Sequence, residues 1–137
     1  LYTNMKPAHT IEVVSNFISR NTNYFISNDL DIFGFRSILN IIFTHNLFSY
    51  NQIYYLQKVG IPMGCKCGPT LANLYLYALE QHYLNIHPDM IYFRFIDDIF
   101  IAQKDALDTH ELTSQFSYLK LNIVEDKKVN FLDLNIW

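Results

Sequence analysis

The sequence predicts an α+β fold in which a small antiparallel sheet packs against helices. Apolar residues recur at helical spacing in four segments, and between them short runs of β-branched and aromatic residues come in pairs joined by brief turns. Half of the 137 residues are hydrophobic, and 11 Phe and 10 Tyr supply large side chains for a core. The chain therefore forms one domain or part of one, and its low charge argues against disorder.

The first third of the chain predicts two helices that pack into the core. Residues 1–7 are expected to end a strand and enter a turn, after which Thr10 can cap the first helix. The polar stretch 21–28 is a connection, and Asp29 or Asp31 can cap the second, strongly amphipathic helix. The apolar positions that define these helices are Ile11, Val14, Phe17 and Ile18, followed by Ile32, Phe35, Ile38, Leu39, Ile42 and Phe43.

A change of period predicts strands in residues 47–59, where two short strands join around residues 51–52. Residues 60–69 then hold three glycines and two prolines, which specify a loop of definite shape. A helix follows, with Pro69 suited to its first turn. The side of this helix that is expected to face the core carries Leu71, Leu74, Tyr75, Ala78, Leu79 and His82.

The last part of the chain predicts a hairpin, a helix and a final hairpin. The first hairpin covers residues 92–101, and the helix runs from 106 to 119. The tail from 121 to 136 indicates a hairpin that turns at residues 126–128. The residues of the helix that are expected to point inward are Leu107, Leu112, Phe116 and Leu119.

Two adjacent aspartates, Asp97 and Asp98, mark the tip of the hairpin at 92–101. The apolar runs on either side predict strands buried in a sheet. Neighbouring carboxylates repel, and a buried charge without a partner is costly, so a divalent cation at the tip would explain the pair. Magnesium takes oxygen ligands and is usually held by one or two carboxylates plus substrate phosphates. The alternative is an ordinary acidic turn whose side chains bond to the local backbone.

The glycine-rich loop at 60–69 is a second candidate for chemistry. Backbone N–H groups of a loop that opens into a helix N-terminus can face a phosphate or a base. The loop is neither a Walker motif, which would end in Gly-Lys-Ser/Thr, nor a dinucleotide-binding motif. A tight turn between strand and helix explains it equally well, so the loop alone leaves both interpretations open.

The overall composition indicates the cellular compartment of the protein more clearly than its function. The net charge of −3 gives no electrostatic sign of a nucleic-acid partner, although a fragment can have its basic parts elsewhere. No apolar run reaches the length of a membrane span, and no signal peptide is visible. Cys65 and Cys67 are too close to brace the fold, and no His lies at zinc-ligand spacing beside them, which favours a reduced, intracellular setting. Because the first residue is Leu1, we expect the chain to begin inside a longer protein.

Taken together, the motifs resemble those of a reverse transcriptase, of the type found in Penelope-like retroelements and telomerase-related enzymes. The loop Gly-x-Pro-Met-Gly at 60–64, the Ala-Asn pair at 72–73 and the run Arg-Phe-Ile-Asp-Asp-Ile-Phe at 94–100 follow the order of that family. Phe-Leu-Asp at 131–133 and Leu-Tyr-Thr-Asn at 1–4 match two further motifs of the family, so the resemblance spans the whole chain.

The resemblance implies the palm, with part of the fingers, of a right-hand polymerase. Residues 1–137 would form a partial reverse transcriptase domain that lacks the thumb and the strand of the first catalytic aspartate, which would lie shortly before Leu1. The piece alone is therefore expected to be inactive. Two smaller departures are Phe95, where the family commonly has Tyr, and the small-residue stretch 65–68, where Cys can pack as a small side chain.

The same resemblance implies roles for individual residues. Asp97 would be the essential ligand of Mg²⁺ or Mn²⁺, and Asp98 a secondary one that contacts metal or primer. Tyr2 would lie beneath the sugar and select deoxynucleotides, although by itself it is an ordinary buried aromatic. The residues that would line the incoming nucleotide and template base are Tyr2, Gln57, Gly60, Pro62 and Gly64.

The implied partners are an RNA template, a DNA primer, deoxynucleotides and the remaining polymerase regions of the parent chain, and for a eukaryotic retroelement the location would be nuclear. Lys120, Lys127 and Lys128 are candidates for phosphate contacts but are better explained as solvated surface lysines, and Asp133 as part of a closing turn. Three alternatives stay open: a non-catalytic palm that binds nucleic acid or a partner, an RNA-templated RNA polymerase, and a purely structural α+β domain.

Overall fold

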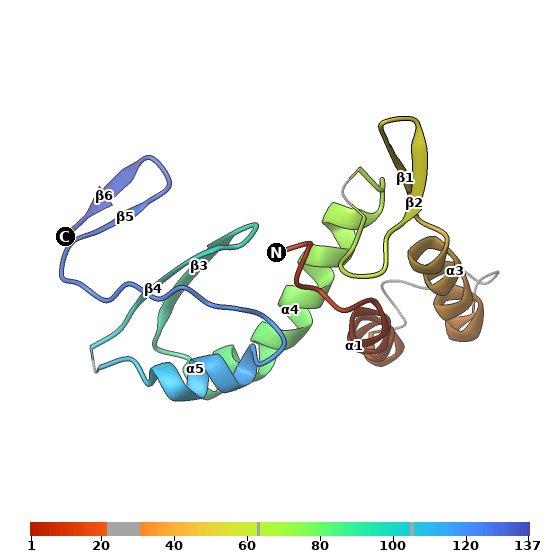
Figure 1. Cartoon of the computed structure of the whole chain (residues 1–137). Coiled ribbons are helices and arrows are strands. Elements are labelled where there is room, and N and C mark those ends of the chain that lie inside the picture. The colour runs from red at the N-terminus through yellow and green to blue at the C-terminus, as the bar shows by residue number, and fades with distance from the viewer. Residues whose placement is uncertain (22–30, 63, 105) are drawn as a thin grey trace. The chain divides into compact units, whose positions relative to one another are not determined.

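The computed structural model describes residues 1–21, 31–62, 64–104 and 106–137. Within these ranges the chain forms four helices and six short strands (Figure 1). In chain order they are α1 (Pro7–Arg20), α3 (Ile32–Thr44), β1 (Leu47–Tyr50), β2 (Ile53–Leu56), α4 (Gly68–Ile86), β3 (Ile91–Phe95), β4 (Asp98–Ala102), α5 (Thr109–Gln115), β5 (Val129–Phe131) and β6 (Leu134–Ile136).

The strands pair as three antiparallel hairpins, β1 with β2, β3 with β4 and β5 with β6. The predicted α+β class is therefore confirmed, although the described strands form three two-stranded sheets and not one larger sheet. None of the helices in the described ranges is long and apolar enough to span a bilayer. The chain divides within α4 into two compact units, Leu1–Ala78 and Leu79–Trp137, which are described separately below.

In the first unit, the prediction that Thr10 caps the first helix is wrong. Helix α1 begins at Pro7, with Lys6 as its N-cap, and Thr10 is fully buried inside it. The reason is that the ring of Pro7 already holds the φ angle of a first helical turn and its missing N–H costs nothing there. Residues 2–4 form a turn closed by a bond from the N–H of Asn4 to the carbonyl of Leu1, and no strand is assigned to them.

The cap of the second helix and the first hairpin of this unit match their predictions, but only Leu39 and Phe43 of the expected core positions of that helix are buried, and Ile38 is exposed. Asp31 caps α3, since its carboxylate accepts a hydrogen bond of 2.6 Å from the N–H of Gly34. Most of the predicted connection at 21–28 lies outside the described residues. Asn51 and Gln52 join β1 to β2 with φ angles of 49° and 63°, the left-handed pair typical of a tight hairpin turn.

Helix α4 contributes to both units, and Pro69 lies in its first turn as predicted. Of its expected core positions, Leu71 and Tyr75 are buried, whereas His82 is exposed. The buried hydrophobic residues of the first unit are Met5, Val14, Ile18, Leu39, Phe43, Ile61, Leu71, Ala72, Tyr75 and Leu76. Those of the second unit are Tyr83, Leu112 and Phe116.

Two boundaries predicted for the second unit are wrong. Helix α5 covers only Thr109–Gln115, because the carboxylate of Asp108 accepts from two backbone N–H groups and caps the helix there. The last hairpin turns at residues 132–133 and not at 126–128. Its register pairs Phe131 with Leu134, which Leu132 permits by adopting a left-handed φ of 54°.

Candidate active site

The paired aspartates lie at the tip of the β3–β4 hairpin, as predicted. Phe95 pairs with Asp98, so Ile96 and Asp97 form the turn. Ile96 has a φ of 56°, a left-handed conformation that a β-branched side chain adopts only under strain. Asp97 and Asp98 are both exposed, so the turn presents two neighbouring carboxylates at the surface of this unit.

The prediction that these two strands are buried in a sheet is wrong for one face of the hairpin. Along β3 the side chains alternate between exposed and half-buried, and Phe93 and Phe95 are 60% and 55% exposed. Tyr92 and Arg94 point to the other face, where both contact Glu80 of α4. Helix α4 thus covers the face of Tyr92 and Arg94, in part through polar groups, whereas Phe93 and Phe95 stay largely exposed on the opposite face.

Glu80 is the one buried acidic residue among those that the structure describes, at 3% exposure. Its Oε1 atom lies 2.5 Å from Nε of Arg94 and accepts a hydrogen bond of 2.8 Å from the hydroxyl of Tyr92. Burial, followed by the nearby charge of Glu80, raises the pKa of Tyr92 well above its ordinary value, so this hydroxyl stays a donor. Sequence reasoning did not single out Glu80, although it is the only charged residue in α4.

The last hairpin contacts the aspartate hairpin through an aromatic pair. The rings of Phe100 in β4 and Phe131 in β5 lie with their centroids 5.7 Å apart. The Phe-Leu-Asp motif at 131–133 therefore packs beside the strand that begins with Asp98. Asp133 itself is exposed in the turn between β5 and β6, which agrees with its predicted place in a closing turn.

In the first unit, the structure brings Tyr2 against the glycine-rich loop. The N–H of Ile61 donates to the carbonyl of Tyr2 at 2.8 Å. Gly60 has a φ of 79°, and a Cβ placed on it would lie 2.8 Å from the same carbonyl oxygen. A Cβ on Gly68 would lie 3.8 Å from the ring of Tyr2. Close approach of the chain around Tyr2 thus explains why glycine is needed at position 60.

The other residues predicted to line a nucleotide differ in their exposure. Gln57 uses both ends of its amide inside the protein, accepting from Asn46 and donating to the carbonyl of Val59, each at 2.8 Å. Pro62 is buried, whereas Gly64 is exposed with a φ of 93° and open space around the position of a Cβ. Of these residues, Gly64 offers the most accessible backbone for a ligand.

The two cysteines of the loop contact each other as free thiols. Their Sγ atoms lie 3.1 Å apart, and both side chains are half-buried. Burial, followed by the hydrogen bond between the two thiols, raises the pKa of the Cys67 thiol to about 11.

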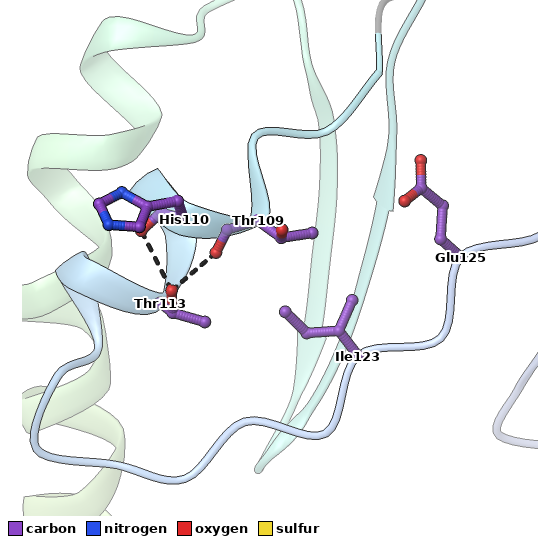
Figure 2. A pocket seen from close by; sticks show the side chains of 5 residues that line it. All are labelled: Thr109, His110, Thr113, Ile123 and Glu125. Atoms are coloured by element: carbon purple, nitrogen blue, oxygen red, sulfur yellow. Dashed lines mark hydrogen bonds between the residues drawn. The ribbon is translucent and has the colours of Figure 1, made fainter.

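A shallow pocket in the second unit lies between α5 and the segment that follows it (Figure 2). Figure 2 shows the hydroxyl of Thr113 bonded to the backbone carbonyls of Thr109 and His110, at 2.8 and 3.1 Å. Ile123 and Glu125 complete the lining. None of the predicted site residues lines this pocket. The hydroxyl of Thr113 is already hydrogen-bonded within the helix, so we assign no chemistry to the pocket.

The donor set on the hairpin fits a hard divalent cation in part. Among the residues that the structure describes, no group of three or more Asp, Glu, His or Cys side chains could enclose a metal ion. Asp97 and Asp98 offer two neighbouring carboxylates, which suits an ion such as Mg²⁺ whose other ligands are water and substrate phosphates.

Comparison with known proteins supplies the family. A family model described as reverse transcriptase (RNA-dependent DNA polymerase) matches residues 9–132. Telomerase reverse transcriptase of Oryza sativa subsp. japonica is 39% identical over 72 residues, which cover 42% of this chain and 6% of that protein. The chain thus spans a small part of this relative, and no solved structure gives a significant match. Because the family model covers far more than half of the residues, the chain belongs to the reverse transcriptase (RNA-dependent DNA polymerase) family.

Proposed function

We propose that the protein containing this chain extends a primer with deoxynucleotides on an RNA template. The observation that carries the proposal is the pair Asp97 and Asp98, held at the tip of a strained hairpin in a chain of the reverse transcriptase family. Neighbouring carboxylates repel each other, so the pair is unfavourable unless a ligand or a reaction requires it. The left-handed φ of Ile96 is what a two-residue hairpin turn needs, as at Leu132 in the last hairpin.

In this proposal Asp97 is the essential metal ligand and Asp98 a secondary one. Both are exposed on the turn and so are accessible to a cation and to the 3′ end of a primer. Two bound divalent cations, Mg²⁺ or Mn²⁺, would stabilise the attacking and leaving oxygens of an in-line displacement at phosphorus. Asp97 and Asp98 would supply the negative charge that holds them, and a further carboxylate of the parent protein would complete the set.

The first unit would hold the nucleotide and the template base. The backbone of Tyr2 lies against Gly60 and Ile61, and its ring lies near Gly68, so a sugar-selecting ring would stand close to the loop that lines the nucleotide. Gly64 would present open backbone, whereas Pro62 and Gln57 would shape the loop from behind. Specificity for sequence would come from base pairing, so these groups need only match the shape of a base pair.

We further infer that the parent protein is encoded by a retroelement of the Penelope-like type and acts in the nucleus. The support is the order of the motifs at 1–4, 60–64, 94–100 and 131–133, which resembles that group. The segment would be the palm with part of the fingers, and the thumb and the first catalytic aspartate would come from other regions of the parent protein.

Substitution of one aspartate tests the function in the intact parent protein. We expect Asp97→Asn to abolish primer extension on an RNA template with Mg²⁺ or Mn²⁺, because the amide cannot supply the negative charge that a metal ligand needs. Asp133→Asn is a matched control from the other turn of the same unit and is expected to keep full activity. Primer extension by the Asp97→Asn protein at the wild-type rate would refute the assignment.

The same assay separates the alternative functions. Ribonucleotide incorporation in preference to deoxynucleotides would identify an RNA-templated RNA polymerase. A wild-type protein that binds the RNA–DNA hybrid but does not extend the primer would be a non-catalytic palm. This alternative stays open because the described hairpin carries only two carboxylates.

A further inference from the structure

We infer that Arg94, oriented by the buried carboxylate of Glu80, is a positioning residue that fixes the turn carrying Asp97 and Asp98 for cation binding. The consequence for nucleotide addition rests on the proposed function. The consequence for cation binding rests on the contacts described below and can be measured without the reaction.

The first step of the argument is that Glu80 has no evident purpose other than to hold β3. It is a buried acidic side chain on an otherwise uncharged helix, a placement that is costly unless the charge is paired. Its partners are Nε of Arg94 at 2.5 Å and the hydroxyl of Tyr92 at 2.8 Å. Both partners come from the same strand, two residues apart, so Glu80 fixes the face of β3 against α4.

The second step is that the other end of the arginine reaches the turn. Nη1 of Arg94 donates a hydrogen bond of 3.0 Å to the carbonyl oxygen of Ile96, the residue with a left-handed φ of 56°. A guanidinium is a rigid planar fork, so an arginine that is ion-paired to a buried carboxylate at Nε and donates to a carbonyl through Nη1 is held at both ends. The position of Glu80 is thus transmitted through Arg94 to the peptide bond that leads into Asp97.

The third step is that the strands of this hairpin contribute no residue to the buried hydrophobic core among the described residues. The second unit buries only three hydrophobic residues, Tyr83, Leu112 and Phe116, and none of them belongs to β3 or β4. The two carboxylates also repel each other, which favours movement of the turn when no cation is bound. Groups that orient metal ligands from behind typically change metal affinity or activity by roughly 10- to 100-fold when they are substituted.

The test compares direct Mn²⁺ binding, measured by calorimetry on the intact parent protein, with Mg²⁺-dependent primer extension. Arg94→Lys keeps a positive charge opposite Glu80 but removes the fork that also reaches Ile96. We expect this variant to bind Mn²⁺ roughly 10- to 100-fold more weakly. We also expect a higher Mg²⁺ requirement in primer extension, with little change in the KM for deoxynucleotides.

A combined substitution separates positioning from stability. Glu80→Leu, Tyr92→Phe and Arg94→Met together remove every polar group of the network, so no unpaired charge stays buried. If the network only stabilises the fold, the triple variant should show the hydrogen-exchange protection of β3 and the Mn²⁺ affinity of the wild type. If Arg94 positions the turn, the triple variant should show wild-type protection of β3 but still bind Mn²⁺ weakly.

Glu111→Gln is the matched control, because it removes the negative charge from the contact of 3.1 Å to His87 in the same unit and lies outside the turn. Its Mn²⁺ binding should equal that of the wild type. Wild-type Mn²⁺ affinity in the Arg94→Lys protein overturns the inference, as does a wild-type protein that binds no Mn²⁺. If the wild type binds Mn²⁺ but extends no primer, and Arg94→Lys weakens that binding, the proposed function fails and the positioning role stands.

Discussion

The two units of the chain differ in the sign of their charge. Residues 1–78 carry five Lys and Arg against three Asp and Glu, and none of the three lies between residues 32 and 78. Residues 79–137 carry five Lys and Arg against ten Asp and Glu. The net charge of −3 is therefore the sum of a positive first unit and a negative second unit. A carboxylate-rich unit suits cations, whereas an acid-free loop region suits phosphates, so the absence of a basic patch overall says little about nucleic-acid partners.

The units also differ in how they hold their candidate site residues. The first unit buries ten hydrophobic residues and fixes Tyr2 against the loop by a backbone bond and close packing at Gly60. The second buries three hydrophobic residues, and its hairpin is attached to α4 by Glu80. In the first unit, the effect of a substitution on stability should therefore depend mainly on the side-chain volume that it removes. In the second unit it should depend mainly on the hydrogen bonds and charges that are lost.

The largest stability effect in this comparison should follow from emptying the core of the first unit. Tyr75 is fully buried and its hydroxyl lies 2.9 Å from Nδ1 of His9. We expect Tyr75→Ala to lower the local opening free energy by about 3–5 kcal/mol, as is usual for a buried aromatic. Hydrogen exchange of peptides from α1 and α4 measures this free energy. The control Tyr77→Ala, at a half-exposed position of the same helix, should lower the opening free energy far less. Equal effects would contradict the assignment of the core.

A smaller effect should separate the two left-handed glycines of the loop. Gly60→Ala places a Cβ against the carbonyl of Tyr2 and also strains the backbone, so we expect a loss of about 2–3 kcal/mol. Gly64→Ala meets no neighbouring atom and should cost only the backbone strain, about 1 kcal/mol. Hydrogen exchange of the loop gives both values. If Gly60→Ala were no worse than Gly64→Ala, Tyr2 would not pack where the structure places it.

The smallest effects should be the responses of His9 in the first unit and Tyr92 in the second unit to pH. Burial lowers the pKa of His9, so the folded first unit prefers the neutral ring and loses this stability as the pH falls below the ordinary histidine value of 6.5. Burial raises the pKa of Tyr92, so the second unit loses stability as the pH rises above the ordinary tyrosine value of 10. Exchange rates of α1 and β3, corrected for intrinsic pH dependence, measure both. We expect His9→Phe to remove the acid response of the first unit, and Tyr92→Phe to reduce the alkaline response of the second unit, where burial also raises the pKa of Tyr83.

Much of the fold was predictable because it depends on local signals. The Asn-Gln turn, the Asp31 cap and the Pro69 helix start are short-range effects, and the structure confirms all three. The errors arose where two local signals competed. Pro7 started α1 earlier than Thr10 could cap it, and the cap at Asp108 shortened α5. The last hairpin turned at Leu132, since pairing of Phe131 with Leu134 outweighed the polar residues at 126–128.

What the sequence determined by itself was the class of fold, the tip of the aspartate hairpin and the family resemblance, because adjacent residues carry each of these signals. Only the tertiary structure could show that Tyr2 packs on Gly60 and that Glu80, distant in sequence from the aspartates, orients Arg94 beneath their turn. Such contacts depend on which faces of two elements meet. A lone acidic residue in an apolar helix gives no indication of its partner until the strand that supplies the partner lies against it.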